Sequence, residues 1–147
     1  MSHDLDDLLL TWESNYKKGL LSFWILLVLH ELPAYALELA ALVEQASAGS
    51  LSADDNSLYR ALNRFERLAL IRGESRPSDV GPDRRYYRLT AKGVGLLRRF
   101  TERNILIFQR QEVQQRLEAL LKVIQRAGAN GLLFVESYVA GRGAPHE

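Results

Sequence analysis

The 147-residue sequence predicts a mainly helical α+β fold, in which a three-helix core is followed by a two-stranded β-hairpin. Apolar residues recur at helical spacing over most of the chain, whereas residues 70–90 change to a period of two and are rich in β-formers. From residue 91 onward, an apolar helical stripe continues for longer than one small domain needs. With 47% hydrophobic and 25% charged residues, the chain can bury a core.

Several absences narrow the class of protein. The sequence contains no cysteine, which excludes a disulfide scaffold, thiolate catalysis and cysteine-rich metal sites. The acidic start is not that of a signal peptide, and the longest apolar run, residues 19–29, is shorter than the ~20 residues that span a bilayer. The three histidines show no metal-ligand spacing, and no catalytic triad is evident. We therefore expect a cytoplasmic protein that is not an enzyme and has no cofactor or metal.

The net charge of +1 conceals an uneven distribution of charged residues. Residues 1–56 sum to −7, residues 57–103 to +7 and residues 104–147 to +1. The basic residues of the middle segment are nearly all arginine. A basic middle is typical of a protein that binds a polyanion, although a solvated surface with internal ion pairs gives the same count.

Two helices are predicted before the first proline-containing turn. Residues 1–17 form an N-terminal amphipathic segment, because its large apolar residues fall at i, i+3 and i+4 spacing. These residues are Leu5, Leu8, Leu9, Trp12 and Tyr16. Residues 18–31 are apolar almost all round, which predicts a buried helix, and Leu32-Pro33 ends it. Residues 34–48 predict the next helix.

Residues 52–68 predict a further helix with a basic outer surface. Ser52 is the expected N-cap, and Asp55 completes a pair like a capping box. Leu58, Leu62 and Phe65 fall on one face and predict its buried side. The polar residues, together with one tyrosine, fall mostly elsewhere on the helix and predict its outer side.

A β-hairpin is predicted over residues 70–90. Residues 70–76 and 84–90 alternate as strands do, and the seven residues between them include two prolines, a glycine and two aspartates. The second strand opens with Arg84 and Arg85. Tyr86 and Tyr87 are consecutive, so one is expected in the core and the other exposed.

The C-terminal segment, residues 91–147, is predicted to mediate dimerisation. Thr90 caps a helix that extends to about residue 126, and its second half carries apolar residues spaced four, three and four apart. So long an apolar stripe needs a partner, most simply a second copy of the chain. The predicted dimerisation residues are Trp12, Phe108, Val113, Leu117, Leu120 and Ile124.

Three helices followed by a hairpin are the elements of a winged helix-turn-helix domain, predicted here over residues 18–90. In that fold the third helix enters the DNA major groove, and the hairpin, or wing, lies on the backbone or in the minor groove. Arginine pairs with guanine, asparagine pairs with adenine, and further basic side chains bind phosphates. The predicted DNA-binding residues are Ser57, Tyr59, Arg60, Asn63, Arg64, Arg67, Arg76, Arg84 and Arg85.

Two motifs resemble the PadR-type transcriptional regulators. One is Leu58-Tyr59-Arg60-Ala61-Leu62, and the other runs from Gly81-Pro82 through Arg84-Arg85-Tyr86-Tyr87-Arg88-Leu89-Thr90 to Lys92-Gly93; the similarity covers roughly residues 18–100. The resemblance implies a DNA-binding homodimer, paired through C-terminal helices, that usually represses transcription and associates with the bacterial nucleoid. It places Ser57, Tyr59, Arg60, Asn63 and Arg64 on the DNA-reading helix, and Arg84 and Arg85 on the wing. A period extender of the cyanobacterial circadian clock has the same general size, so a clock-gene target is one hypothesis.

The sequence also departs from that family, which leaves alternatives open. Alanine stands at Ala36 and at Ala69, where the family commonly has glycine. Since alanine adopts a positive φ at a cost, the turn at Ala69 is expected to be reshaped or the helix to continue. A protein-interaction module that has lost DNA binding is therefore one alternative. A sensor of small aromatic compounds, with Trp12, Trp24 and Phe108 lining a pocket, is another, although ordinary core packing explains these rings as well.

Overall fold

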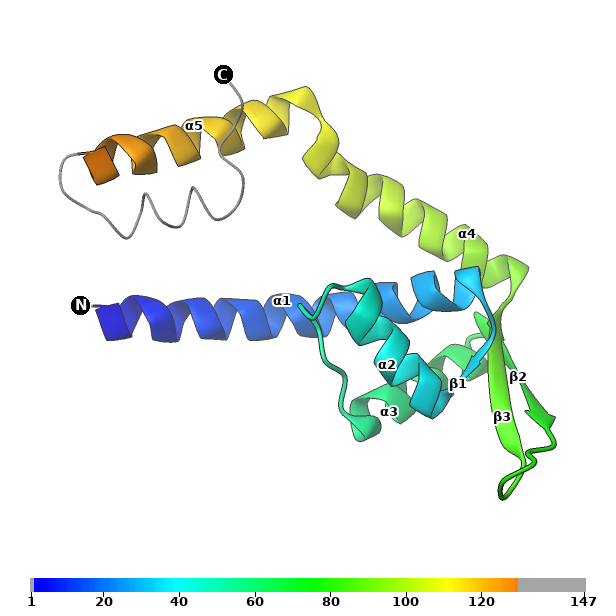
Figure 1. Ribbon diagram of the computed structural model, residues 1–147. Coiled ribbons are helices and arrows are strands. Elements are labelled where there is room, and N and C mark those ends of the chain that lie inside the picture. Colours follow the sequence, from blue (N-terminus) through cyan, green and yellow to red (C-terminus); the bar gives the residue numbers. More distant parts are fainter. Residues whose placement is uncertain (1, 130–147) are drawn as a thin grey trace. The chain divides into compact units, whose positions relative to one another are not determined.

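The computed structural model describes the backbone of residues 2–129 and the side chains of residues 4–122 (Figure 1). The chain divides into two compact units, with the boundary in the sequence between residues 100 and 101. The first contains α1 (Ser2–Glu31), β1 (Ala34–Tyr35), α2 (Ala36–Ala46), α3 (Asp55–Arg67), β2 (Ile71–Arg76), β3 (Arg84–Leu89) and α4 (Ala91–Phe100). The second contains η1 (Thr101–Ile105), η2 (Leu106–Gln109) and α5 (Gln111–Ala129). Within the described residues, no helix is long and apolar enough to cross a membrane.

The predicted fold class is confirmed, since helices α1, α2 and α3 pack around one core beside an antiparallel sheet. The largest fully buried side chains come from all three helices: Ile25, Leu39, Val43, Leu58 and Leu62. Burial of side chains of this size stabilises a fold by about 1.5–3 kcal/mol each. The core therefore fixes which face of α3 points inward.

The N-terminal region is one continuous helix rather than the two that the sequence predicts. No proline lies between Tyr16 and Leu20, so every residue there keeps the backbone N–H that a continuous helix needs. The change from an amphipathic to an almost wholly apolar sequence instead reflects a change from an exposed to a buried part of the same helix. The first half of α1 exposes its large apolar residues, Trp12 to 75%, whereas the second half buries them.

The helix predicted over residues 34–48 is wrong at its start. Ala34 and Tyr35 form a short strand, β1, which pairs with Tyr87 and Tyr86 of β3. The sheet therefore has three strands in the order β1-β3-β2, not the two predicted. Tyr35 then begins α2 from an extended conformation, and its N–H donates to the Glu38 carboxylate at 3.4 Å.

The prediction that Ser52 caps the third helix is wrong, because α3 begins two residues later. Asp54 is the N-cap, and its carboxylate accepts hydrogen bonds from the N–H and the hydroxyl of Ser57, both at 2.8 Å. A carboxylate also interacts favourably with the positive end of the helix dipole. Leu51, immediately before this turn, is buried and its N–H donates to the Ser47 hydroxyl.

The end of α3 keeps its tight turn although glycine is absent. Ala69 adopts a left-handed conformation with φ of 58°. The Leu70 N–H donates to the Phe65 carbonyl at 2.9 Å, and the Ala69 N–H to the Glu66 carbonyl at 3.0 Å. This pattern is the Schellman motif that usually contains glycine. The expectation that the turn is reshaped, or that the helix continues, is therefore wrong.

The predicted hairpin is confirmed to within one residue at its ends. Strand β2 pairs with β3 from Ile71 opposite Leu89 to Arg76 opposite Arg84. Thr90 caps α4 as expected, since its hydroxyl accepts from the Gly93 N–H at 3.1 Å. A Cβ at Gly93 would clash with the Leu70 carbonyl and the Leu89 side chain, so glycine is required where α4 meets the base of the wing.

The single helix predicted over residues 91–126 is wrong as a continuous element. A π-helical turn and a 3-10 turn occupy residues 101–109, and Arg110 is extended with ψ of 138°. Asn104, Ile105, Ile107 and Phe108 in this stretch are all poor helix formers. From Gln111 the sequence returns to strong helix formers, and α5 begins there.

Replacement of Ala69 by glycine is expected to stabilise the protein. Glycine removes the steric cost of the left-handed conformation, about 1 kcal/mol, while the hydrogen bonds of the turn remain. Urea unfolding measures this gain. Ala41→Gly, at an exposed position inside α2, is the matched control and should lose about 0.5–1 kcal/mol. Equal losses in both variants would contradict the strain at Ala69.

Candidate nucleic-acid interface

One polar stripe runs along the side of α3 opposite its buried face. Asn56, Arg60, Asn63 and Arg67 recur at i, i+4, i+7 and i+11, and all four are exposed. Leu58, Ala61, Leu62 and Phe65 on the other side are buried. The stripe contains two arginines and two asparagines, which are the side chains that pair with guanine and adenine in the major groove.

The two flanks of the stripe face different neighbours. Tyr59 lies on the flank toward the wing, and Arg64 lies on the flank toward α1. Arg64 Nη2 donates to the Ser22 hydroxyl at 3.2 Å, which links α3 to α1. Arg60 Nη2 donates to the Ser57 hydroxyl at 3.4 Å, so Arg60 is also partly oriented.

The first turn of α3 is electrostatically polarised. The Ser57 backbone N–H and hydroxyl, with Arg60 nearby, lower the pKa of the Asp54 carboxyl below its usual value. Asp54 thus stays ionised at the N-terminus of α3, and its charge caps the helix instead of pairing with an arginine of the stripe.

The outer face of the wing is strongly basic. Because successive strand residues alternate, Arg72 and Arg76 of β2 share this face with Arg84 and Arg88 of β3. Arg76 lies 4.5 Å from the ring centre of Tyr86, and Arg84 lies 4.5 Å from that of Tyr35. These cation–π contacts hold the two guanidinium groups over the sheet. None of the four arginines forms an ion pair with another described residue.

The inner face of the wing differs, because Arg85 is paired. Its guanidinium makes two hydrogen bonds to the Glu66 carboxylate of α3, which raise the pKa of Arg85 above its usual value. Tyr87, on the same face, is 6% exposed, and burial raises the pKa of its phenol. Tyr86 is half-buried on the outer face, so the expected split between the two tyrosines is broadly confirmed.

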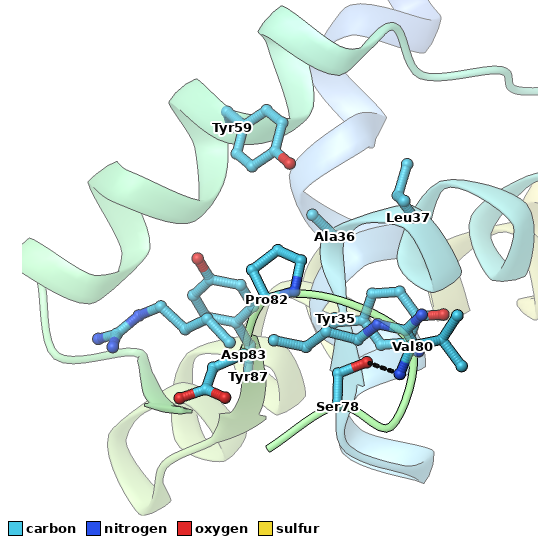
Figure 2. Close-up of a pocket in the computed structure, with 11 residues that line it drawn as sticks. Tyr35, Ala36, Leu37, Tyr59, Ser78, Val80, Pro82, Asp83 and Tyr87 are labelled. Carbon is cyan, nitrogen blue, oxygen red and sulfur yellow. Dashed lines mark hydrogen bonds between the residues drawn. The ribbon is translucent and has the colours of Figure 1, made fainter. Parts of the chain in front are cut away.

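A hollow separates the tip of the wing from the helices. Its volume is about 350 Å³, and Figure 2 shows Tyr59 of α3 on one side and Pro82 and Val80 of the wing on the other. Tyr35 and Leu37 also line it. Exposed apolar side chains thus lie between the two basic surfaces.

Most of the predicted DNA-binding residues gather on two surfaces of the first unit. Arg60, Asn63 and Arg67 lie in the α3 stripe with Ser57, Tyr59 and Arg64 beside it, and Arg76 and Arg84 lie on the outer face of the wing. Arg85 is the exception, since it points to Glu66. The predicted set omits Asn56, Arg72 and Arg88, although helical spacing and strand alternation place all three.

The predicted dimerisation residues are largely exposed within one chain. Trp12 is 75% exposed, Phe108 51%, Leu117 43% and Leu120 57%, whereas Val113 is half-buried. The side chain of Ile124 lies outside the described residues. Trp24 is half-buried and packs edge-to-face against Phe23, whereas Trp12 is mostly exposed.

The fold and its basic surfaces define a winged helix-turn-helix protein. Residues 25–99 match the family described as the transcriptional regulator PadR-like family, and the chain belongs to that family. The resemblance noted in the sequence is thus confirmed. No curated protein matches the chain significantly.

Solved structures of the same family share the fold. A PadR-like transcription factor from Bacteroides fragilis is 30% identical, with 75% of this chain and 98% of that one covered and a TM-score of 0.53. A PadR-like transcriptional regulator from Bacillus cereus is 28% identical, with 71% and 93% covered and a TM-score of 0.54. A PadR family transcription regulator from Clostridium difficile is 26% identical, with 67% and 99% covered and a TM-score of 0.54.

The Asp54 cap predicts a pH dependence of stability. A carboxyl whose pKa is lowered by folding stabilises the protein above its unfolded pKa of about 3.8, and this contribution disappears as the pH falls through the folded pKa. Asp54→Asn keeps a capping oxygen that does not titrate. Urea unfolding should therefore favour wild type at pH 7 and lose that preference toward pH 3. A difference that is independent of pH would contradict the assignment.

Proposed function

We propose that this protein is a homodimeric, sequence-specific DNA-binding regulator that represses transcription. In this proposal, α3 enters the major groove and the wing contacts the backbone or minor groove. The polar stripe of Asn56, Arg60, Asn63 and Arg67 is the observation that carries the proposal. It is as long as the helix and lies directly opposite the buried face, so it is the surface that a groove would meet.

Affinity and selectivity are divided between the two surfaces. Arg60 and Asn63 supply base contacts, with Ser57, Tyr59, Arg64 and Arg67 around them on α3. Arg76 and Arg84 supply phosphate contacts, because arginine on a wing neutralises backbone charge without reading sequence. The cation–π contacts of these two arginines orient them before DNA arrives, which reduces the entropy cost of binding.

A second copy of the chain is the proposed partner of the exposed apolar residues. Leu5, Leu8, Leu9 and Trp12 expose at least half of their surface on α1, and Leu117 and Leu120 are exposed on α5. Isolated exposed apolar residues are ordinary, but a run of them along one helix marks an interaction surface. A two-fold dimer would present two α3 helices to half-sites about one helical turn apart.

Repression, a cytoplasmic location and the absence of a cofactor complete the proposal. A dimer bound to a promoter operator blocks transcription by occupying the site. The family membership supports a transcriptional role. No described feature favours a clock gene over another target.

A ligand-gated form of this function has one supporting observation. An apolar cavity of about 230 Å³ lies between α1, α3 and α4, lined by Phe23, Leu26, Phe65 and Leu97 with Arg64 at its edge. A small aromatic compound bound there would contact a residue of the DNA-binding flank, and so could alter DNA affinity. The position differs from the predicted pocket of Trp12, Trp24 and Phe108.

The direct test is selection of bound duplexes from a random DNA pool, with the mass of the protein–DNA complex measured by light scattering. A two-fold-symmetric winning motif bound by two chains is the expected result. Weak binding without sequence preference would contradict the proposal. Tight binding to an acidic protein in that case would favour the interaction-module alternative.

Two arginine substitutions should have different effects on the selected duplex. Arg60→Ala should weaken specific binding by about 1–3 kcal/mol and leave non-specific binding nearly unchanged, because it removes a base contact. Arg84→Ala should weaken binding to all duplexes and reduce the slope of log affinity against log salt by about one. Filter binding across a salt series measures both. Identical behaviour of the two variants would refute the division of roles.

A further inference from the structure

Arg85 differs from the other arginines of the wing because its guanidinium pairs with a carboxylate of α3. Arg85 Nε donates to Glu66 Oε1 at 3.3 Å, and Nη2 donates to Glu66 Oε2 at 2.8 Å. A bidentate pair fixes the relative orientation of both planar groups. Since Glu66 belongs to α3 and Arg85 to β3, the pair joins the DNA-reading helix to the wing.

Gly73 provides the space that the Arg85 side chain needs to reach Glu66. Gly73 pairs with Tyr87, two positions from Arg85 on the same face of the sheet. A Cβ at Gly73 would clash with the Arg85 guanidinium, so any larger residue must push it away from Glu66. Gly73 has no positive φ, and its absence of a side chain is therefore used for space and not for backbone conformation.

Packing alone gives the tip of the wing little support against the helices. The hollow lined by Tyr59, Val80 and Pro82 separates the tip from α3, and Val80 is 87% exposed. The wing is held at its base by the close approach at Gly93, by the sheet and by the buried Tyr87 on its inner face, whereas its tip borders the hollow. The Glu66–Arg85 pair joins β3 to α3 beside this hollow, which Arg85 lines.

We propose that Glu66, Arg85 and Gly73 are positioning residues. The Glu66–Arg85 ion pair, which lies over Gly73, fixes the inclination of the wing relative to α3 and thereby sets the sequence selectivity of DNA binding. This inference rests on the proposed DNA-binding function. It gives Arg85 a role other than the phosphate contact predicted from the sequence. Phosphate contacts by the wing determine how α3 is placed in the groove, so a loosely held wing admits more than one placement.

The pair contributes little to stability, which makes the role testable. The side chains of Arg85 and Glu66 are 47% and 27% exposed, and ion pairs at such positions are weakened by solvent. Glu66→Ala and Gly73→Ala should therefore both fold. Gly73→Ala also leaves the net charge of the protein unchanged, so the salt slope separates a loss of wing positioning from a new phosphate contact by Arg85.

The first experiment compares affinities for the selected duplex and a scrambled duplex of equal length. Glu66→Ala and Gly73→Ala should each lower the ratio of specific to non-specific affinity by about three- to tenfold. Gly95→Ala is the control, because a Cβ there meets nothing within 4 Å, and its ratio should equal that of wild type. The salt slope should not change in Gly73→Ala or in Arg85→Ala.

The opposite result has a distinct signature. If Arg85 instead binds phosphate, removal of Glu66 frees it, specific affinity rises, and Arg85→Ala reduces the salt slope by about one, as Arg84→Ala does. That outcome overturns the inference. A wild-type protein without sequence preference would instead refute the proposed function.

A second experiment needs no DNA. The chain contains no cysteine, so Asp55→Cys and Val80→Cys accept two spin labels, on α3 and on the wing tip. With the labelled protein diluted in unlabelled protein, electron–electron double resonance measures the distance within one chain. The distribution should be narrow in the parent protein and broader in Glu66→Ala and Gly73→Ala. An unchanged distribution in both variants overturns the inference whatever the DNA results.

Discussion

The burial of one side of α3 is the constraint on which the rest of the first unit depends. Leu58, Leu62 and Phe65 are at most 3% exposed, and together they hold the helix in a single rotational setting. A rotation by one residue would expose a leucine and bury an arginine, each at a cost of kilocalories. Because the setting is fixed, the packing of the core also fixes the direction in which the polar stripe points.

Hydrogen bonds at the C-terminal end of α3 connect this helix to the base of the wing. The carbonyls of Leu68, Ala69 and Leu70 belong to the C-cap of α3 and the two residues that follow it. Lys92 Nζ donates to the Leu68 carbonyl at 2.7 Å, and the Thr90 hydroxyl lies 2.7 Å from the Ala69 carbonyl. Both donors come from the chain just after β3. The helix end and the base of the wing are therefore tied together, and the left-handed Ala69 is tolerated within that network.

The arginines of the basic segment have at least three different environments. Arg76 and Arg84 lie over aromatic rings, Arg64 is hydrogen-bonded to α1, and Arg85 is paired with a carboxylate. Charge counting treats them alike, yet only an arginine without a protein carboxylate offers its full charge to a phosphate. The electrostatic pattern of the sequence therefore indicates a polyanion-binding region without assigning each residue its role.

The sequence by itself determined that helices precede a hairpin and that a helix follows it, and it determined the inward face of α3, because helical and strand periodicities are local properties of the chain. It also placed the hairpin and indicated the family through residues 58–62 and 81–93 together, which the match over residues 25–99 confirms. Only the tertiary structure decided that Ala34 and Tyr35 join the sheet, that Ala69 accepts a positive φ, and that Arg85 turns to Glu66 across Gly73. These features depend on residues brought together from distant positions, and their energies are set by packing and hydrogen bonds that no local pattern records.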